Sequence, residues 1–159
     1  MSAASKTRAM LAAMLLPGAG FAATSCTMAL TPIAFGNYDA FVSTARDTSG
    51  TIVVTCTRSG GPSPTVTIAI GPGMYGGSTS TRKMKQNGGG DLLSYNLFQD
   101  AARTVLWGDI VGTNAFRQFL AVPNKGSAQL TATIFGRIPA GQDVSIGTYS
   151  DNVLVSVLP

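Results

Sequence analysis

The 159-residue chain contains no histidine and no glutamate, and its acidic residues are all aspartates. The lack of histidine removes the commonest general base and metal ligand, so a catalytic thiol or a metal centre is disfavoured. Five aspartates remain as acid–base candidates, and each has a turn-like sequence context in which Asp commonly hydrogen-bonds its own backbone. They are Asp91, Asp100, Asp109, Asp143 and Asp151. Because no spacing among them indicates a carboxylate pair, we expect neither enzymatic activity nor a cofactor or metal.

Long apolar runs are also absent, apart from one near the start of the chain. Lys6 and Arg8 precede this short run, which ends in Pro17 and small residues. The order is typical of a secretory signal peptide, and we expect residues 1–22 to be cleaved off, with cleavage one residue later nearly as plausible. A membrane anchor is disfavoured because the run falls short of the ~20 apolar residues of a spanning helix. The sequence therefore predicts export out of the cytoplasm.

Charge is scarce, since only 11% of the residues are charged. Without the 22 residues of the signal peptide the chain has 137 residues, a usual size for one domain, and we expect residues 23–159 to form it. The loss of Lys6 and Arg8 leaves 9 basic side chains against 7 acidic ones, a net charge of about +2. So small a charge argues against nucleic acid as a partner.

Cysteine is limited to Cys26 and Cys56. In an exported domain of this size, an even number of cysteines favours a disulfide. A bridge closing this loop would stabilise the fold by roughly 3 to 4 kcal/mol in the chain-entropy model.

The composition predicts an almost entirely β structure, because glycine, threonine, serine and valine are plentiful and strong helix formers are few. Alternating apolar residues mark six main strands, which with turns about every ten residues indicate a β-sandwich. In the strand at 51–56, Ile52, Val54 and Cys56 are expected to face inward. The expected strands are 26–30, 51–56, 65–70, 93–97, 129–138 and the end of the chain.

The end of the chain reads as a strand that stops with the sequence. Val153, Val155 and Val157 alternate with Asn152, Leu154 and Ser156, the period of a half-buried strand. A strand at a terminus needs a neighbour. If no strand of this chain lies beside it, another chain must supply one.

Three other segments have structural interpretations that we prefer to functional ones. The basic cluster of Arg82, Lys83 and Lys85 lies in a glycine-rich segment, and we expect a solvated hairpin rather than a site for anions. Trp107 is expected to anchor the core rather than to stack on a sugar. The segment 114–122 is apolar and undecided between a strand and a helical turn; we expect extra core there, with an exposed contact surface as the alternative.

Several blocks together resemble the spore coat protein U domain, the subunit family of archaic chaperone–usher pili. In order and spacing they cover nearly all of residues 26–157. They are Ser25-Cys26-Thr27, Ala34-Phe35-Gly36-Asn37-Tyr38, Ile52-Val53-Val54-Thr55-Cys56, Arg82-Lys83-Met84, Leu93-Ser94-Tyr95-Asn96-Leu97-Phe98-Gln99-Asp100, Trp107-Gly108-Asp109, Phe135-Gly136-Arg137-Ile138-Pro139-Ala140-Gly141-Gln142 and Gly147-Thr148-Tyr149-Ser150-Asp151.

The resemblance implies an immunoglobulin-like sandwich that lacks its last strand, with a disulfide between Cys26 and Cys56. It implies a periplasmic chaperone, an outer-membrane usher and other pilus subunits as partners. In that mechanism the chaperone lends a strand to an open groove, and the N-terminal extension of the next subunit replaces it. One wall of the groove would be formed by Val153, Val155 and Val157, or by the alternate face of the same strand, Leu154 and Leu158.

The sequence also departs from the family pattern. Polymerising subunits carry about a dozen alternating residues before the first cysteine, whereas only Ala23-Thr24-Ser25 would precede Cys26 here. We therefore expect a subunit that accepts a strand, donates none and lies at the end of an assembly. In addition, Ile110 follows the Trp-Gly-Asp block where the family usually has glycine. The alternative hypothesis is a free secreted β-sandwich that binds a glycan or a surface as an adhesin.

Overall fold

A computed structural model describes residues 23–159, so the expected signal peptide lies outside the described residues. The described chain is all β, as predicted, and none of it forms a helix that could cross a membrane. The strands are β1 (Thr24–Thr31), β2 (Arg46–Arg58), β3 (Thr65–Ile70), β4 (Lys83–Gln86), β5 (Leu92–Ser94), β6 (Asn96–Phe98), β7 (Phe116–Phe119), β8 (Gly126–Ile138), β9 (Tyr149–Ser150) and β10 (Val155–Leu158).

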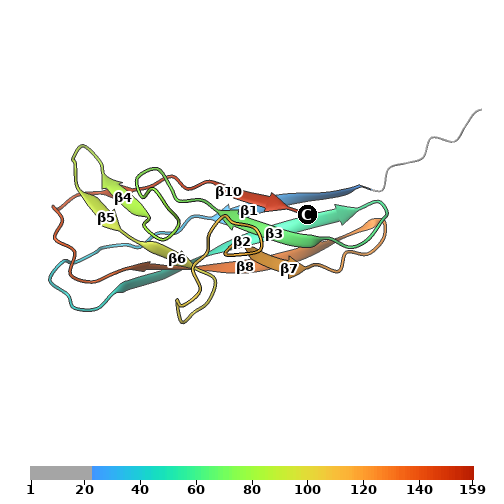
Figure 1. Ribbon diagram of the computed structural model, residues 1–159, viewed down its shortest axis with the longest axis horizontal. Coiled ribbons are helices and arrows are strands. Elements are labelled where there is room, and N and C mark those ends of the chain that lie inside the picture. The colour runs from blue at the N-terminus through green and yellow to red at the C-terminus, as the bar shows by residue number, and fades with distance from the viewer. Residues whose placement is uncertain (1–22) are drawn as a thin grey trace, which may run out of the picture.

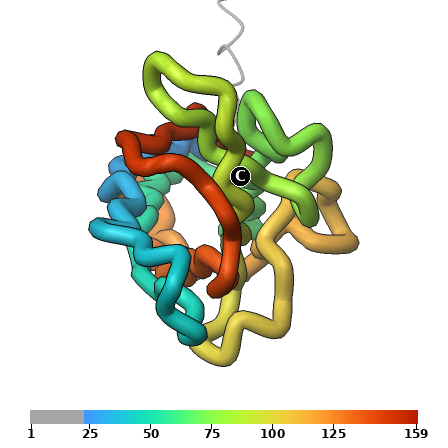
Figure 2. Tube along the Cα trace, turned by 90° about the vertical axis from the view of Figure 1, so that its left-hand side faces the viewer, coloured from blue at the N-terminus to red at the C-terminus, as the bar shows by residue number. Residues whose placement is uncertain are grey.

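These strands form two main sheets and one small one. The first sheet has the order β1-β2-β8-β6 and the second β10-β3-β7, while β5-β4-β9 forms the small sheet. The long strands β2 and β8 run along the molecule, and the small sheet lies at one end of it (Figure 1). Viewed along the long axis, the chain winds around one interior (Figure 2). The arrangement agrees with the predicted immunoglobulin-like β-sandwich.

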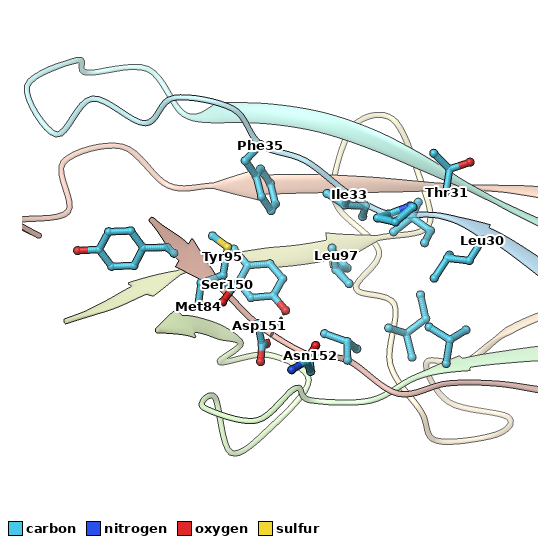
Figure 3. Close-up of a pocket in the computed structure, with 16 residues that line it drawn as sticks. Leu30, Thr31, Ile33, Phe35, Met84, Tyr95, Leu97, Ser150, Asp151 and Asn152 are labelled. Atoms are coloured by element: carbon cyan, nitrogen blue, oxygen red, sulfur yellow. Dashed lines mark hydrogen bonds between the residues drawn. The ribbon is translucent and has the colours of Figure 1, made fainter. Parts of the chain in front are cut away.

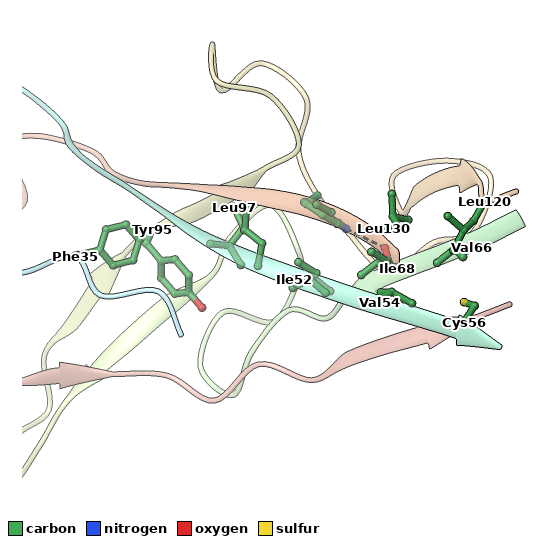
Figure 4. Packing of buried hydrophobic residues seen from close by; sticks show 14 of the residues in the cluster. Phe35, Ile52, Val54, Cys56, Val66, Ile68, Tyr95, Leu97, Leu120 and Leu130 are labelled. Carbon is green, nitrogen blue, oxygen red and sulfur yellow. Dashed lines mark hydrogen bonds between the residues drawn. The ribbon is translucent and has the colours of Figure 1, made fainter. Parts of the chain in front are cut away.

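The core follows the alternation of the long strands. Ile52, Val54 and Cys56 of β2 are fully buried, as expected, and they pack with the inward residues of β3 and β8 (Figure 4). The inward residues of those two strands are Val66, Ile68, Ile70, Leu130, Ala132 and Ile134. Alternate residues reach the same face of a strand, so the pattern in the sequence is enough to place them.

The strand predicted at 93–97 is in fact two strands in different sheets. β5 pairs with β4 in the small sheet, whereas β6 pairs with β8 in the first sheet. The chain changes sheet at Tyr95, whose amide donates to the carbonyl oxygen of Arg82 at 3.0 Å. Tyr95 is buried, and its ring meets that of Phe35 edge to face at 5.8 Å. Alternation alone does not reveal such a switch, because both strands turn the same residues inward.

Trp107 is a core anchor, as predicted. Its side chain is fully buried, and Nε1 donates a hydrogen bond of 2.9 Å to the carbonyl oxygen of Ile68. Its ring packs against Phe116 of β7 at 5.2 Å between centroids. The undecided segment at 114–122 is therefore partly strand and partly core, since Leu120 is buried as well, while Phe119 is 63% exposed.

The prediction of a solvated hairpin is wrong for Arg82. Its side chain is fully buried, and its guanidinium donates to backbone carbonyl oxygens instead of facing water. The acceptors are Gly71 at 2.9 Å, Ile70 and Trp107 at 2.7 Å each, and Thr79 at 3.0 Å. The hairpin itself exists as β4 and β5, with Lys85 exposed on it. Arg82 is tolerated inside because these carbonyl groups engage four of the five donors of its guanidinium.

The predicted disulfide is present. Cys26 and Cys56 are bonded, and they lie directly opposite each other on β1 and β2. The bridge therefore ties the first strand of the described chain to the centre of the first sheet.

Candidate functional site

β10, the last strand, has one paired edge and one open edge. It pairs antiparallel with β3, from Val155 opposite Ile70 to Leu158 opposite Thr67. The chain itself therefore supplies a neighbour for this strand on that side. Among residues 23–159, no strand pairs with its other edge.

The register of β10 determines which backbone groups reach the open edge. The amide of Gly71 donates to the carbonyl oxygen of Leu154 at 2.9 Å, next to the first pair of the ladder. Hydrogen-bonding residues alternate along an antiparallel strand, so the main chain of Val155 and Val157 points away from β3. These amides and carbonyls are available to a further strand.

β1 is an edge strand too, and its inward row is uncovered. Met28 and Leu30 lie opposite Val54 and Ile52, and directly opposite residues of an antiparallel pair share a face. The two β2 residues are fully buried, yet Met28 is 39% exposed and Leu30 is 44% exposed. Apolar side chains on the core side of β1 therefore remain open to solvent.

β10, in the second sheet, also has side chains on its core face that are incompletely buried. Val155 and Val157 share a face with the buried Ile70 and Ile68, but they are only half-buried. β1 and β10 lie beside each other without pairing (Figure 1). We call the gap between these two strands the β1/β10 seam. It is a line along which the sandwich is not closed, with apolar residues of the core face on both sides.

A cavity of about 390 Å³ opens at this seam, next to the small sheet (Figure 3). Of the residues predicted for a groove, Val153 and Val155 line this cavity, and Val157 packs against the core. The other lining residues are Leu30, Thr31, Pro32, Ile33, Phe35, Ile70, Met84, Tyr95, Leu97, Ile134, Tyr149, Ser150, Asp151 and Asn152.

Leu154 and Leu158, the alternate face named from the sequence, lie on the other side of β10. They line a separate cavity of about 490 Å³ with Met74 and Val111. The valine row thus faces the interior, whereas the two leucines lie on the opposite face of β10.

Sequence reasoning missed the opposite wall of the cavity. Leu30 and Ile33 come from the end of β1 and the segment after it, and Phe35 follows them. The alternation of Cys26, Met28 and Leu30 was available as a signal for an inward row. The alternation could not reveal that no strand among residues 23–159 covers this row.

The far end of the cavity is polar. The hydroxyl of Tyr95 donates to Asp151 Oδ2 at 2.7 Å, and the amide of Met74 donates to Asp151 Oδ1 at 2.9 Å (Figure 3). Burial and the neighbouring carboxylate raise the pKa of Tyr95 well above its usual value. Tyr95 therefore stays protonated and acts as a hydrogen-bond donor.

Of the other aspartates singled out in the sequence, Asp100 stabilises a turn as expected, whereas Asp91 bonds to the amide of a residue 54 positions later. Asp91 accepts a hydrogen bond of 2.7 Å from the amide of Ser145, and Asp100 accepts one of 2.8 Å from the amide of Val105. The hydrogen bonds from Ser145 and from Val105 lower the pKa values of the two carboxyl groups. Within residues 23–159, no group of three or more cysteines or aspartates could hold a metal ion.

Comparison with known proteins gives three similarities. The family model of the Spore Coat Protein U domain matches residues 14–156. Protein U of Myxococcus xanthus is 32% identical over 133 residues, which are 77% of this chain and 69% of that protein. A chain in the crystal structure of the CsuC–CsuE chaperone–tip adhesion subunit pre-assembly complex, from archaic chaperone–usher Csu pili of Acinetobacter baumannii, has the same fold. Its TM-score is 0.56 at 19% identity, over 84% of this chain and 39% of that one.

Proposed function

Because the chain belongs to the Spore Coat Protein U domain family, we propose that it is a structural, non-enzymatic subunit of a chaperone–usher pilus or surface coat. In this function it accepts a strand from another protein at the β1/β10 seam. The structural neighbour supports the proposal, since it is a chaperone–subunit complex of such a pilus. A surface structure requires export, which the basic and apolar residues at the start of the sequence favour.

The observation that carries the proposal is the exposed core face on both sides of the seam. Met28 and Leu30 on β1, and Val155 and Val157 on β10, have the orientation of core residues without the burial. A strand inserted between them would pair with the open edge of β10 and bury both rows with its alternate side chains. Val153 and Val155 would form one wall of the groove, and Leu154 and Leu158 would stay outside.

Burial of apolar side chains in the cavity would contribute to binding. A valine or leucine side chain of an inserted strand that becomes fully buried against Leu30, Ile33 and Val155 contributes about 1.5 to 3 kcal/mol. Main-chain hydrogen bonds with the open edge of β10 would add to this contribution.

The seam also indicates the kinds of partner. An unpaired strand edge next to exposed apolar side chains is prone to aggregation, so such a subunit needs protection before assembly. We assign this protection to a periplasmic chaperone. A neighbouring subunit would then take its place at an outer-membrane usher.

A strand-like peptide tests the proposal. The chain without residues 1–22, with its disulfide formed, is mixed with a synthetic peptide of about ten residues in which valine alternates with threonine. At a peptide concentration one hundred times Kd, binding contributes ~2.7 kcal/mol, which raises the melting temperature by roughly 10 °C. A peptide of the same composition with its valines grouped at one end is the control, and we expect it to have no effect.

Two matched variants locate the binding. Leu30→Asp places a charge on the rim of the seam, and we expect it to abolish the effect of the peptide. Leu154→Asp places the same charge on the outward face, where the leucine is 80% exposed, and we expect it to leave the effect intact. Failure of the alternating peptide to raise the melting temperature, or equal loss in both variants, would contradict strand acceptance at the seam.

A further inference from the structure

Asp151 lies at the polar end of the cavity, four residues before β10 begins, and joins three parts of the chain. Its carboxylate accepts hydrogen bonds from the Tyr95 hydroxyl at 2.7 Å and from the amide of Met74 at 2.9 Å. Tyr95 stands between β5 and β6, and Met74 lies in the loop after β3. We call Asp151, Tyr95 and Met74 the Asp151 brace.

The loop after β3 is shaped to admit this carboxylate. Gly73 has a φ of +80°, and a Cβ on it would overlap Asp151 Oδ2. Two features therefore favour glycine at this position: the positive φ, and the Asp151 carboxylate, which lies where a Cβ would be. Arg82 fixes the start of the same loop by donating hydrogen bonds to the carbonyl oxygens of Ile70 and Gly71.

The segment after Asp151 has few other restraints. The ladder with β3 begins at Val155, and the hydrogen bond from Gly71 to Leu154 is adjacent to it. Val153, which forms part of the cavity wall, precedes both. Besides Asp151, the stretch before Leu154 has a weak hydrogen bond of 3.7 Å from Asn152 Nδ2 to Met74 Sδ. The hydrogen bonds of Asp151 are therefore the main polar restraint on the cavity wall at Val153.

We infer that the Asp151 brace positions the start of β10 and so holds the wall of the β1/β10 seam at Val153 in place to receive a strand. The inference rests on the proposed function for its biological meaning, but the positioning itself is a property of the chain alone. Asp151, Tyr95 and Gly73 are thus positioning residues for strand acceptance.

Hydrogen–deuterium exchange on the full chain, without peptide, tests the positioning. Tyr95→Phe removes one hydroxyl from the brace. We expect the amide of Gly71, which donates to the carbonyl oxygen of Leu154 at the start of β10, to exchange at least about tenfold faster relative to the core amide of Val54. Tyr38→Phe is the control, because it also removes a hydroxyl that makes hydrogen bonds, in this case with Pro139 and Gln142. Equal exchange at Gly71 in the two variants would overturn the inference.

A second pair of variants tests the consequence for strand acceptance. Gly73→Ala places a Cβ where the Asp151 carboxylate lies and so displaces it. Gly77→Ala is the control, because it also puts an alanine at a positive φ, +76°, but no atom lies within 4 Å of its Cβ. We expect Gly73→Ala to slow association of the valine–threonine peptide at least about tenfold and Gly77→Ala to leave it unchanged. Equal association rates in the two variants would overturn the inference. Should the unaltered chain bind no peptide, the proposed function fails, while the exchange measurement still decides whether the brace positions β10.

Discussion

The substitution Arg82→Met removes the largest buried polar group of the described chain and keeps much of its apolar stem. The guanidinium donates to the carbonyl oxygens of Gly71, Ile70, Trp107 and Thr79 at 2.7 to 3.0 Å. These acceptors belong to the end of β3, the loop after it and the segment that contains Trp107. Arg82 therefore holds three separate parts of the chain together.

The expected loss follows from two opposing effects. Each hydrogen bond from a charged group contributes about 1.5 to 3 kcal/mol, and buried carbonyl oxygens that lose their donor remain desolvated. The substitution also relieves the cost of burying a charge, a cost that appears as a lowered pKa of Arg82 caused by burial. A buried carbonyl oxygen left without a donor costs about 1 to 3 kcal/mol, and the relief of the buried charge offsets part of the sum over the four acceptors. We expect a net loss of about 3 kcal/mol for Arg82→Met.

Urea unfolding followed by circular dichroism measures this loss. With a slope of about 1.5 to 2 kcal/mol per molar urea, the midpoint should fall by roughly 1.5 to 2 M. Lys85→Met is the matched control, because Lys85 is exposed and its amine only approaches the ring of Tyr75 at 5.8 Å. We expect the control to stay within about 0.5 kcal/mol of the unaltered chain. If the two variants unfold at the same urea concentration, Arg82 does not stabilise the fold in the way its contacts indicate.

Two other perturbations have defined outcomes. Replacing Cys26 and Cys56 together by alanine opens a loop with a sequence separation of 30, and the free energy of unfolding should fall by roughly 3 to 4 kcal/mol in urea; a loss below about 1 kcal/mol would contradict the chain-entropy estimate. Asp47 accepts two hydrogen bonds of 2.8 Å from Arg137, and this pairing lowers the pKa of Asp47. Its stabilising effect is therefore complete above the unfolded pKa of about 3.9 and is lost as the pH falls through the lower folded value. Melting temperatures measured from pH 5 to pH 2 should decline less for Asp47→Asn than for the unaltered chain, and parallel declines would refute the role of this pair.

The features that could be predicted from the sequence are those encoded by neighbouring residues. The alternation of Ile52, Val54 and Cys56 placed them inward, because successive side chains of a strand point to opposite faces. Trp107 was expected in the core because a large ring contributes most when it is buried. Together with the expectation of export, the count of two cysteines indicated the disulfide.

The features that were missed depend on residues far apart in the chain. Arg82 looked like a surface residue because lysine neighbours surround it, whereas its acceptors are carbonyl oxygens up to 25 positions away. Asp151 looked like a turn residue, yet its partner Tyr95 lies 56 positions earlier. No local pattern distinguishes a charge that finds such partners from one that remains in water.

By itself, the sequence determined that this chain builds a β-sandwich of the Spore Coat Protein U domain family and that its last residues form a strand with a valine row. Only the tertiary structure decided that β10 has one open edge, that the valines face inward and that β1 lies across a gap from it. The physical reason is that side-chain alternation is a local property of each strand. Whether a sheet edge is paired depends on how every other strand is placed, and here the placement leaves core-facing side chains uncovered on both sides of one seam.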